Sequence, residues 1–326
     1  MNENLLKEKI RKVTSEDKNL PVFSYSKMDL FKSCPFSYNL KYNQKKYTSD
    51  TSIALELGSL CHFILELKGK SLAQGEKVDY AKLNKIITDG FFEEYIGEKE
   101  SGCLLGTNEL KKKYFDTWWE KCSASGMTYD EKMQVFDKVL HEEMENTEWT
   151  PYLFEYPFEF VWDNKVIIKG FIDRIDIKDG EYRTVDYKTS KKVYDKSKLA
   201  TSLQFGIYAL AILNDFDKLP IESLYRFILI DEEQKALTLG WEKRLIKALD
   251  KVFNAIENNE KENIWKPSPS PLCHWCNFSA TNPNAKDFKN DCEYYSLWTP
   301  ENKTFSVNKK FDPNKKEEET KRKLVF

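Results

Sequence analysis

A β-hairpin predicted over residues 166–188 constrains the fold of this 326-residue chain more than any other segment. Residues 166–177 are apolar and rich in β-branched side chains, and residues 181–188 form a second run of strand character. Asp179-Gly180 lies between the two runs, and this dipeptide is a strong short-range signal for a hairpin turn. The sequence therefore predicts two adjacent antiparallel strands in the middle of the chain.

Three charged side chains of this hairpin are expected to lie close together. Asp186 and Lys188 are two residues apart, so they point to the same face of their strand. Asp173 provides a second carboxylate on the partner strand. Two acids and a lysine on adjacent strands can hold a divalent cation and position a water molecule beside it. By themselves, the three residues leave an ordinary charged hairpin surface open as the alternative.

The residues around this trio resemble the core of the RecB-like branch of the PD-(D/E)XK nuclease superfamily. Gly170-Phe-Ile-Asp-Arg-Ile-Asp176 matches the segment that carries the first acid, at Asp173, and Asp186-Tyr187-Lys188 matches the (D/E)-x-K element. The resemblance implies an α/β (α+β) restriction-endonuclease-like fold, with a mixed central sheet flanked by helices. It also implies that Asp173, Asp186 and the backbone carbonyl of Tyr187 hold Mg²⁺ or Mn²⁺.

A second match lies in the helix predicted over residues 197–216, which carries an apolar stripe at helical spacing. Gln204 and Tyr208 are four residues apart, so they share one side of this helix. They match the Q-x-x-x-Y element of the family, which implies that they position a DNA strand. Without the resemblance, a half-buried tyrosine at a helix edge would explain the same pattern.

Two upstream residues complete the predicted metal site. His62 follows Gly58-Ser-Leu-Cys in an apolar helix predicted over residues 53–67, and it matches the early histidine of RecB-like nucleases. A neutral imidazole suits Mn²⁺, although a lone histidine on an apolar helix is usually a core residue. Glu155, just before the hairpin, is chosen over Glu159 as a further acid, and both could simply be exposed.

The seven cysteines suggest a second site. Cys273 and Cys276 form a C-x-x-C pair, Cys292 follows, and Cys34 stands far upstream in a Cys-Pro-Phe-Ser-Tyr segment. A C-x-x-C pair suits Zn²⁺ or an iron–sulfur cluster. The odd count, the length of the chain and its polar N-terminus argue against a disulfide framework. The remaining cysteines have no partner at metal-binding spacing and are expected to be buried thiols: Cys61, Cys103 and Cys122.

One cysteine before the nuclease core and three after it resembles the iron–sulfur subset of RecB-like nucleases, including nucleases of CRISPR adaptation. The resemblance implies that Cys34, Cys273, Cys276 and Cys292 hold one [4Fe-4S] cluster. The gap before Cys292 is longer than is usual in the family, so zinc remains an alternative, with His274 as a spare ligand.

Composition limits the class of protein more than its function. Charged residues make up 32% and aromatic residues 14% of the chain, which is typical of a soluble globular protein. The absence of a run of eighteen apolar residues argues against a membrane-spanning segment. The net charge of −2 does not indicate nucleic-acid binding, but metal ions can supply positive charge locally. Exposed lysines after the hairpin are expected where a phosphate backbone would pass: Lys191, Lys192, Lys196 and Lys198.

We divide the chain into five expected regions. A charged lead (1–20) precedes a mostly helical region (21–150), the nuclease core (151–262), a cysteine-rich metal segment (263–300) and a charged tail (301–326). Within the second region, Ser26 is expected to open a capping box for a helix that ends near Cys34. The core is expected to contain a further strand over residues 224–229 and a helix within residues 234–258.

The resemblance implies a metal-dependent deoxyribonuclease, most simply an exonuclease that acts in recombination, repair or replication. Its partners would be single-stranded DNA or duplex ends, and a helicase or recombination protein. A cytoplasmic location follows, in a bacterium or as a viral protein in the host cytoplasm. The alternative is a catalytically inactive RecB-like module that binds DNA and carries a structural zinc or iron–sulfur site.

Overall fold

The computed structural model separates into two compact units, each built from two stretches of the chain. The first unit combines Met1–Phe23 with Thr51–Leu245, and the second combines Ser24–Asp50 with Ile246–Phe326. The structure describes residues 3–47, 53–81, 83, 129–144, 148–196, 199, 202–237, 240–283, 285–299 and 304–312. Cys103, Cys122 and Lys198 lie outside these residues.

A seven-stranded mixed sheet forms the centre of the first unit. Its main order is β1-β3-β4-β5-β6-β7, and β2 pairs in parallel with β4. The central strands β3, β4 and β5 are antiparallel, whereas β5 and β6 are parallel. The strands are β1 (Ile10–Arg11), β2 (Val22–Phe23), β3 (Thr150–Trp162), β4 (Val166–Lys178), β5 (Glu181–Lys188), β6 (Glu222–Phe227) and β7 (Glu232–Lys235).

The predicted hairpin is confirmed. β4 and β5 pair from Arg174 and Val185 to the turn, where Lys178 lies opposite Glu181. The two turn residues have left-handed backbones, with φ of 50° at Asp179 and 76° at Gly180. A two-residue turn with positive φ at both positions matches the right-handed twist of the strands, which is why Asp-Gly specifies it.

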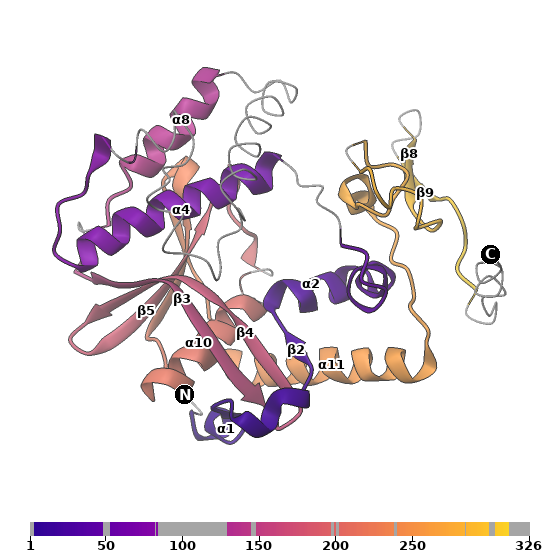
Figure 1. The fold of residues 1–326 in the computed structure, drawn as a ribbon, viewed down its shortest axis with the longest axis horizontal. Coiled ribbons are helices and arrows are strands. Elements are labelled where there is room, and N and C mark those ends of the chain that lie inside the picture. Colours follow the sequence, from indigo (N-terminus) through magenta and orange to yellow (C-terminus); the bar gives the residue numbers. More distant parts are fainter. Residues whose placement is uncertain are drawn as a thin grey trace. The chain divides into compact units, whose positions relative to one another are not determined.

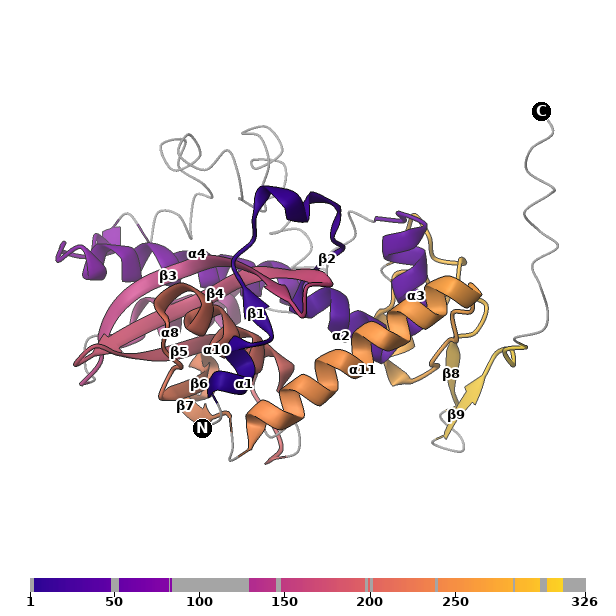
Figure 2. The same cartoon turned by 90° about the horizontal axis from the view of Figure 1, so that it is seen from below.

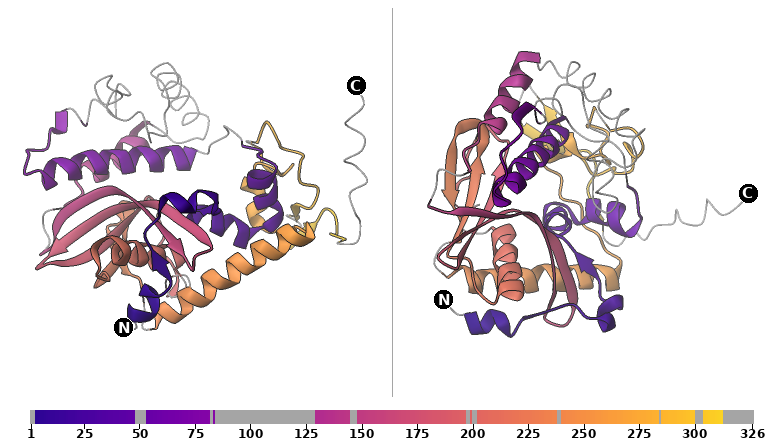
Figure 3. Two further views of the ribbon diagram at one scale, coloured as in Figure 1. Left: turned by 60° about the horizontal axis from the view of Figure 1, so that its bottom comes forward. Right: turned by 60° about the vertical axis from the view of Figure 1, so that its left-hand side comes forward.

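Helices cover both faces of this sheet, which confirms the predicted fold class. Helix α4 (Ile53–Ala73) runs across one face and α10 (Leu203–Phe216) lies on the other (Figures 1 and 3). Helix α8 (Tyr129–Leu140) packs beside α4. The N-terminal α1 (Glu3–Lys7) and β1 lie against α10 (Figure 2). No described helix is long and apolar enough to cross a membrane.

A close approach fixes α4 on the sheet. A Cβ atom added to Gly69 would lie 2.0 Å from the Phe154 ring of β3, so a larger residue would displace that ring. Phe154, Val185 and Tyr187 pack into a continuous buried core with the apolar residues of α4 and α8. Burial of this apolar surface therefore holds α4 against the sheet, at the short distance from β3 that Gly69 allows.

The second unit joins an early helical segment to the C-terminal part of the chain. Its aromatic core stacks Tyr38 on Trp265, with ring centroids 5.8 Å apart. Its elements are α2 (Tyr25–Ser33), α3 (Pro35–Tyr38), a π-helix (Asn39–Asn43), most of α11 (Trp241–Glu262), a 3₁₀ helix η4 (Pro271–Trp275) and the hairpin β8 (Ser296–Thr299) and β9 (Thr304–Val307).

Several expected boundaries were wrong. The N-cap of α2 is Ser24, whose Oγ accepts a hydrogen bond from the backbone N–H of Lys27, and not Ser26. The helix expected from residue 197 begins at Leu203, where Ser202 is the N-cap. Residues 232–235 form strand β7 because they pair with β6, and α11 starts only at Trp241. Residues 304–307 of the expected tail form β9 because β8 offers them a pairing partner.

A buried ion cluster holds the β4–β5 hairpin together from within. Asp176 of β4 is fully buried, and its two carboxylate oxygens accept hydrogen bonds from Arg174 and Arg183. Arg174 also donates to the hydroxyl of Tyr187, at 3.2 Å. Buried charges are stable only when they are paired and hydrogen-bonded. Asp176 pairs with both arginines, and Glu222 provides a second carboxylate 3.7 Å from Arg183.

We predict that Asp176→Ala destabilises the protein by about 3–5 kcal/mol, because it leaves Arg174 buried without its counter-ion and removes the nearer of the two carboxylates that pair with Arg183. Urea denaturation followed by circular dichroism measures the change. Glu148→Ala is the matched control, because it removes an 81% exposed partner of Lys178 on the same hairpin. The control should leave the free energy of unfolding close to that of the wild type, because an exposed ion pair contributes little. Equal midpoints for the two variants would contradict the assigned role of Asp176.

Candidate active site

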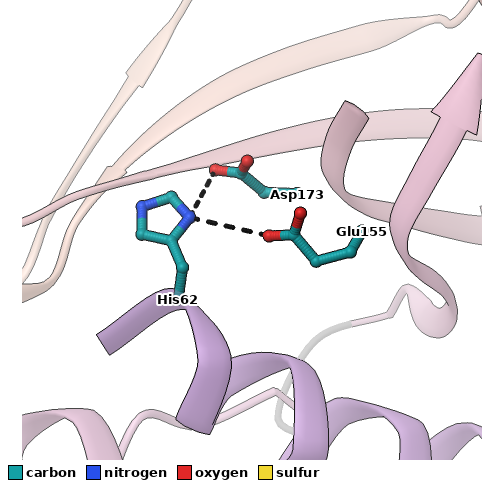
Figure 4. A group of neighbouring side chains, drawn as sticks. All are labelled: His62, Glu155 and Asp173. Carbon is teal, nitrogen blue, oxygen red and sulfur yellow. Dashed lines mark ion pairs between the residues drawn. The ribbon is translucent and has the colours of Figure 1, made fainter. Parts of the chain in front are cut away.

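Three predicted metal ligands meet between α4 and the central strands. His62 of α4, Glu155 of β3 and Asp173 of β4 each present a ligand atom, and these atoms lie within 4.8 Å of one another. Nδ1 of His62 is 3.4 Å from Oδ2 of Asp173 and 3.8 Å from Oε1 of Glu155 (Figure 4). All three side chains are partly buried. One imidazole and two carboxylates form a donor set that suits Mn²⁺ or Mg²⁺.

The register of β3 and β4 explains how the two acids meet. Phe154 pairs with Arg174 and Tyr156 with Ile172, so Glu155 falls opposite Asp173. Glu155 has a φ of 43°, in the left-handed region that residues other than glycine rarely adopt. Such strain persists only where the surrounding structure enforces it, and it is frequent at functional sites. The irregular backbone therefore marks Glu155, and not Glu159, as the acid of this group.

The second core acid lies where β4 and β5 separate. Their ladder ends with Arg174 opposite Val185, one residue before Asp173 and Asp186 would pair. At this point the backbone N–H of Tyr187 donates to Oδ2 of Asp173, at 2.8 Å. The Asp173 side chain thus accepts a backbone hydrogen bond of β5 in place of the regular strand pairing. The carboxylates of Asp173 and Asp186 both lie at the point where β4 and β5 stop pairing, which is an opening in the sheet.

Helix α10, on the face of the sheet opposite α4, holds Asp186. Its Oδ1 accepts hydrogen bonds from Nε2 of Gln204, at 2.7 Å, and from the hydroxyl of Tyr208, at 3.2 Å. Its Oδ2 forms an ion pair with Nζ of Lys188, as the shared strand face predicts. The ion pair is close but poorly directed, so this buried Oδ2 accepts no hydrogen bond of good geometry. Asp186 therefore keeps an oxygen available to a cation.

The pKa values of the two core acids, Asp173 and Asp186, are shifted in opposite directions. Burial and the neighbouring charge of Asp173 raise the pKa of Asp186 to about 6, against the opposing effect of Lys188. The pKa of Asp173 is lowered, because the charges of His62 and Lys188 and the N–H of Tyr187 outweigh its burial. Burial disfavours the charged form of His62, but Asp173 and Glu155 raise its pKa well above the ordinary value. The site is therefore rich in negative charge that a metal cation would neutralise.

The positions of the predicted residues differ from the expectation in two respects. Glu155 belongs to the same group as His62 and Asp173, whereas Asp186 lies outside that group, although it interacts electrostatically with His62 and Asp173. Gln204 and Tyr208 bind Asp186, and their predicted contact with a DNA strand stays a prediction, as does the metal bond to the Tyr187 carbonyl. Sequence reasoning missed Tyr225 of β6, whose ring centroid lies 5.3 Å from the Lys188 ammonium group, and Ser202, which shares a hydrogen bond with the Tyr225 hydroxyl. Strand order decides their proximity, and no local pattern signals it.

The four predicted cysteine ligands lie together in the second unit. Cys34, Cys276 and Cys273 all contribute to the electrostatic environment of Cys292. Each sulfur accepts a backbone hydrogen bond: Cys34 from Ser268, Cys273 from Ser270, Cys276 from Phe278 and Cys292 from Tyr294. Burial raises the pKa of Cys276 and raises that of Cys292 to about 12. Cys61, by contrast, is a fully buried thiol beside His62, as expected.

Comparison with known families agrees with this geometry. The family model described as the PD-(D/E)XK nuclease superfamily matches residues 22–281, which is most of the chain. The chain belongs to the PD-(D/E)XK nuclease superfamily. Asp186-Tyr187-Lys188 on β5 has the form of a (D/E)-x-K element, and Asp173 lies on the neighbouring strand β4.

Individual relatives fall into two groups. The chain is 28% identical over 243 residues to a subunit of the ATP-dependent helicase/deoxyribonuclease of Clostridium perfringens, a match that covers 66% of this chain and 20% of the relative. It therefore spans about a fifth of the length of that relative. It is also 24% identical over 280 residues to the Gene 69 protein of Mycobacterium phage D29, a match that covers 81% of this chain and 97% of the phage protein. The Gene 69 protein of phage L5 is 25% identical over 228 residues, a match that covers 61% of this chain and 72% of the phage protein.

We predict that Mn²⁺ binds more weakly as the pH falls from 8 to 5, because the cation must displace protons from His62 and Asp186. The pKa of Asp186 is about 6, so its proton competes in the lower part of this range. The raised pKa of His62 extends the competition to higher pH. Calorimetric titration with Mn²⁺ measures the affinity.

Two variants separate the competing protons. Asp186→Asn should flatten the pH dependence near pH 6, and His62→Gln should flatten it at higher pH. Both should bind Mn²⁺ more weakly than the wild type at pH 8. An affinity of the wild type that does not change between pH 5 and 8 would contradict the metal assignment.

Proposed function

We propose that this protein is a metal-dependent deoxyribonuclease that hydrolyses phosphodiester bonds. The observation that carries the proposal is the group of His62, Glu155 and Asp173 beside a buried Asp186 that is ion-paired with Lys188. Membership of a nuclease superfamily and the similarity to deoxyribonuclease subunits support the same activity.

The donor set fits Mg²⁺ or Mn²⁺, because it combines carboxylates with one imidazole and leaves Oδ2 of Asp186 without a hydrogen bond. His62, Glu155, Asp173 and Asp186 would hold the metal, together with the carbonyl of Tyr187. When bound, such an ion lowers the pKa of a coordinated water and neutralises charge on phosphate oxygens.

The protein itself supplies orientation and charge. Lys188 keeps its proton, because Asp186 and Asp173 raise its pKa despite its burial. Its ammonium group can therefore donate to an oxygen of the scissile phosphate and stabilise the charge that grows there in the transition state. Gln204 and Tyr208 fix the direction of the Asp186 carboxylate, so its Oδ2, which is ion-paired with Lys188, keeps one position.

We further propose that the substrate is DNA with a free end and that the enzyme is an exonuclease of recombination, repair or replication. The chain resembles part of a protein that is named as a subunit of a helicase/deoxyribonuclease, and phage proteins of nearly matching extent. A helicase or recombination protein is the partner that this similarity suggests. Circular and linear DNA distinguish an exonuclease from an endonuclease, because only an endonuclease cleaves the circle.

We predict that Asp186→Ala and Lys188→Ala each lower the rate of DNA cleavage at least ~10²-fold, because each removes a group that acts on the metal or on the transition-state charge. End-labelled single-stranded and duplex DNA with Mn²⁺ measures the rate, and circular dichroism confirms the fold. Lys178→Ala is the matched control, since this lysine lies at the far end of the hairpin. Near wild-type cleavage by either active-site variant would refute the proposed roles. Metal-independent DNA binding without any cleavage by the wild type would favour an inactive binding module.

We also propose that Cys34, Cys273, Cys276 and Cys292 bind one [4Fe-4S] cluster. Four thiols, each of which accepts a backbone N–H bond, form a donor set that stabilises thiolates, and hydrogen bonds to sulfur are typical of such clusters. Burial raises the pKa of two of these thiols, so the free thiolates are costly and a cationic group would offset that cost.

We predict that Cys34→Ala abolishes metal loading and lowers the melting temperature. Ligation ties the early segment of the second unit to its C-terminal part, and an equivalent covalent crosslink would stabilise the fold by about 4–5 kcal/mol. Elemental analysis of anaerobically purified protein and a thermal melt measure both effects. Cys61→Ala is the control, since it removes a buried thiol outside the proposed site. Iron absent from the wild type would refute the cluster, and one zinc per chain would replace it with the alternative metal.

A further inference from the structure

Lys188 has a second contact besides its ion pair with Asp186. Its ammonium group lies 5.3 Å from the centroid of the Tyr225 ring, within the range of a cation–π interaction. β5 and β6 are parallel, and Asp186 pairs with Tyr225 across them. Paired residues point to the same face of a sheet, and Lys188 shares the face of Asp186. The register of two strands therefore brings Tyr225 beneath the ammonium group.

Tyr225 is held firmly in this position. Its side chain is 2% exposed, and its hydroxyl forms a hydrogen bond with Oγ of Ser202, at 2.9 Å. The rings of Phe205 and Tyr194 pack against it edge-on, with centroids 4.5 and 4.8 Å away. The backbone of Tyr194 is fixed in turn by two hydrogen bonds with the side chain of Gln234.

The hydroxyl of Tyr225 links Lys188 to the helix that holds Asp186. Ser202 is the N-cap of α10, and its Oγ accepts the N–H of Phe205. Two positions later, the same helix presents Gln204, whose amide donates to Asp186. Asp186 and Lys188 are therefore both oriented from the start of α10, one directly and the other through the Tyr225 ring.

We propose that Tyr225 is a positioning residue that holds the Lys188 ammonium in place, an inference that rests on the proposed nuclease function. A bound cation shares the negative charge of Asp186, so the ion pair alone then holds Lys188 more weakly. The ring of Tyr225 attracts the ammonium without competing for a metal, because it offers no anionic ligand. The flexible lysine chain thus keeps one direction while the cation is present.

The experiment compares Tyr225→Leu, Tyr225→Phe and Leu224→Ala with the wild type. Tyr225→Leu removes the ring and should lower kcat about 10- to 30-fold with little change in KM, because Lys188 acts on the transition state. Tyr225→Phe keeps the ring and should restore most of kcat. Leu224 is 2% exposed in the same strand and points to the opposite face of the sheet, so Leu224→Ala should lower the melting temperature and leave kcat close to wild type.

A second measurement does not depend on cleavage. Labelling with an amine-reactive ester, followed by mass spectrometry, reports how freely the Lys188 amine reacts. Labelling of Lys188 should be several-fold faster in Tyr225→Leu than in Leu224→Ala. Equal labelling rates, or equal kcat values for these two variants, would overturn the role of Tyr225. A wild type that never cleaves DNA would instead refute the proposed function, while the labelling comparison would still decide the position of Lys188.

Discussion

The first unit must compensate for the cost of burying one ionised carboxylate, that of Asp186. An ionised acid in the protein interior is costly unless hydrogen bonds and opposite charge compensate for it. Here α10 provides two hydrogen bonds and Lys188 provides the charge, yet the pKa of Asp186 remains raised to about 6. The compensation is therefore incomplete, and a metal cation would supply the remainder. The positions of α10, β5 and β6 all follow from this requirement.

The opening in the sheet results from a competition between backbone and side chain. A regular ladder would continue past Arg174 and Val185 and close the gap between Asp173 and Asp186. The carboxylate of Asp173 instead accepts the N–H of Tyr187, so one backbone bond is exchanged for a charge-assisted one. At this opening, Nδ1 of His62 on α4 lies 3.4 Å from Oδ2 of Asp173. The second unit has a different requirement, because it is assembled from two stretches of the chain that residues 51–245 separate. A metal group shared by its cysteines would compensate for the entropy of bringing such distant segments together.

Local chemistry determined much of this protein. The Asp-Gly turn, the alternation along β5 and the apolar stripe of α10 predicted the hairpin, the shared face of Asp186 and Lys188, and the central helix, because each depends on residues a few positions apart. Helix starts were less well predicted. Ser24 and Ser26 are chemically equivalent N-caps, and only packing selects between them.

Tertiary structure decided the rest, because contacts across strands depend on order and register and not on spacing along the chain. Glu155 lies beside His62 because the pairing of β3 with β4 places Glu155 opposite Asp173. Tyr225 lies beside Lys188 because β6 pairs in parallel with β5. The same reason explains why Gln204 and Tyr208 turned out to hold Asp186. The sequence alone determined which chemical groups the protein carries and the local elements that present them. Only the packing of those elements decided which groups share one charge environment, since electrostatic interaction depends on distance through space.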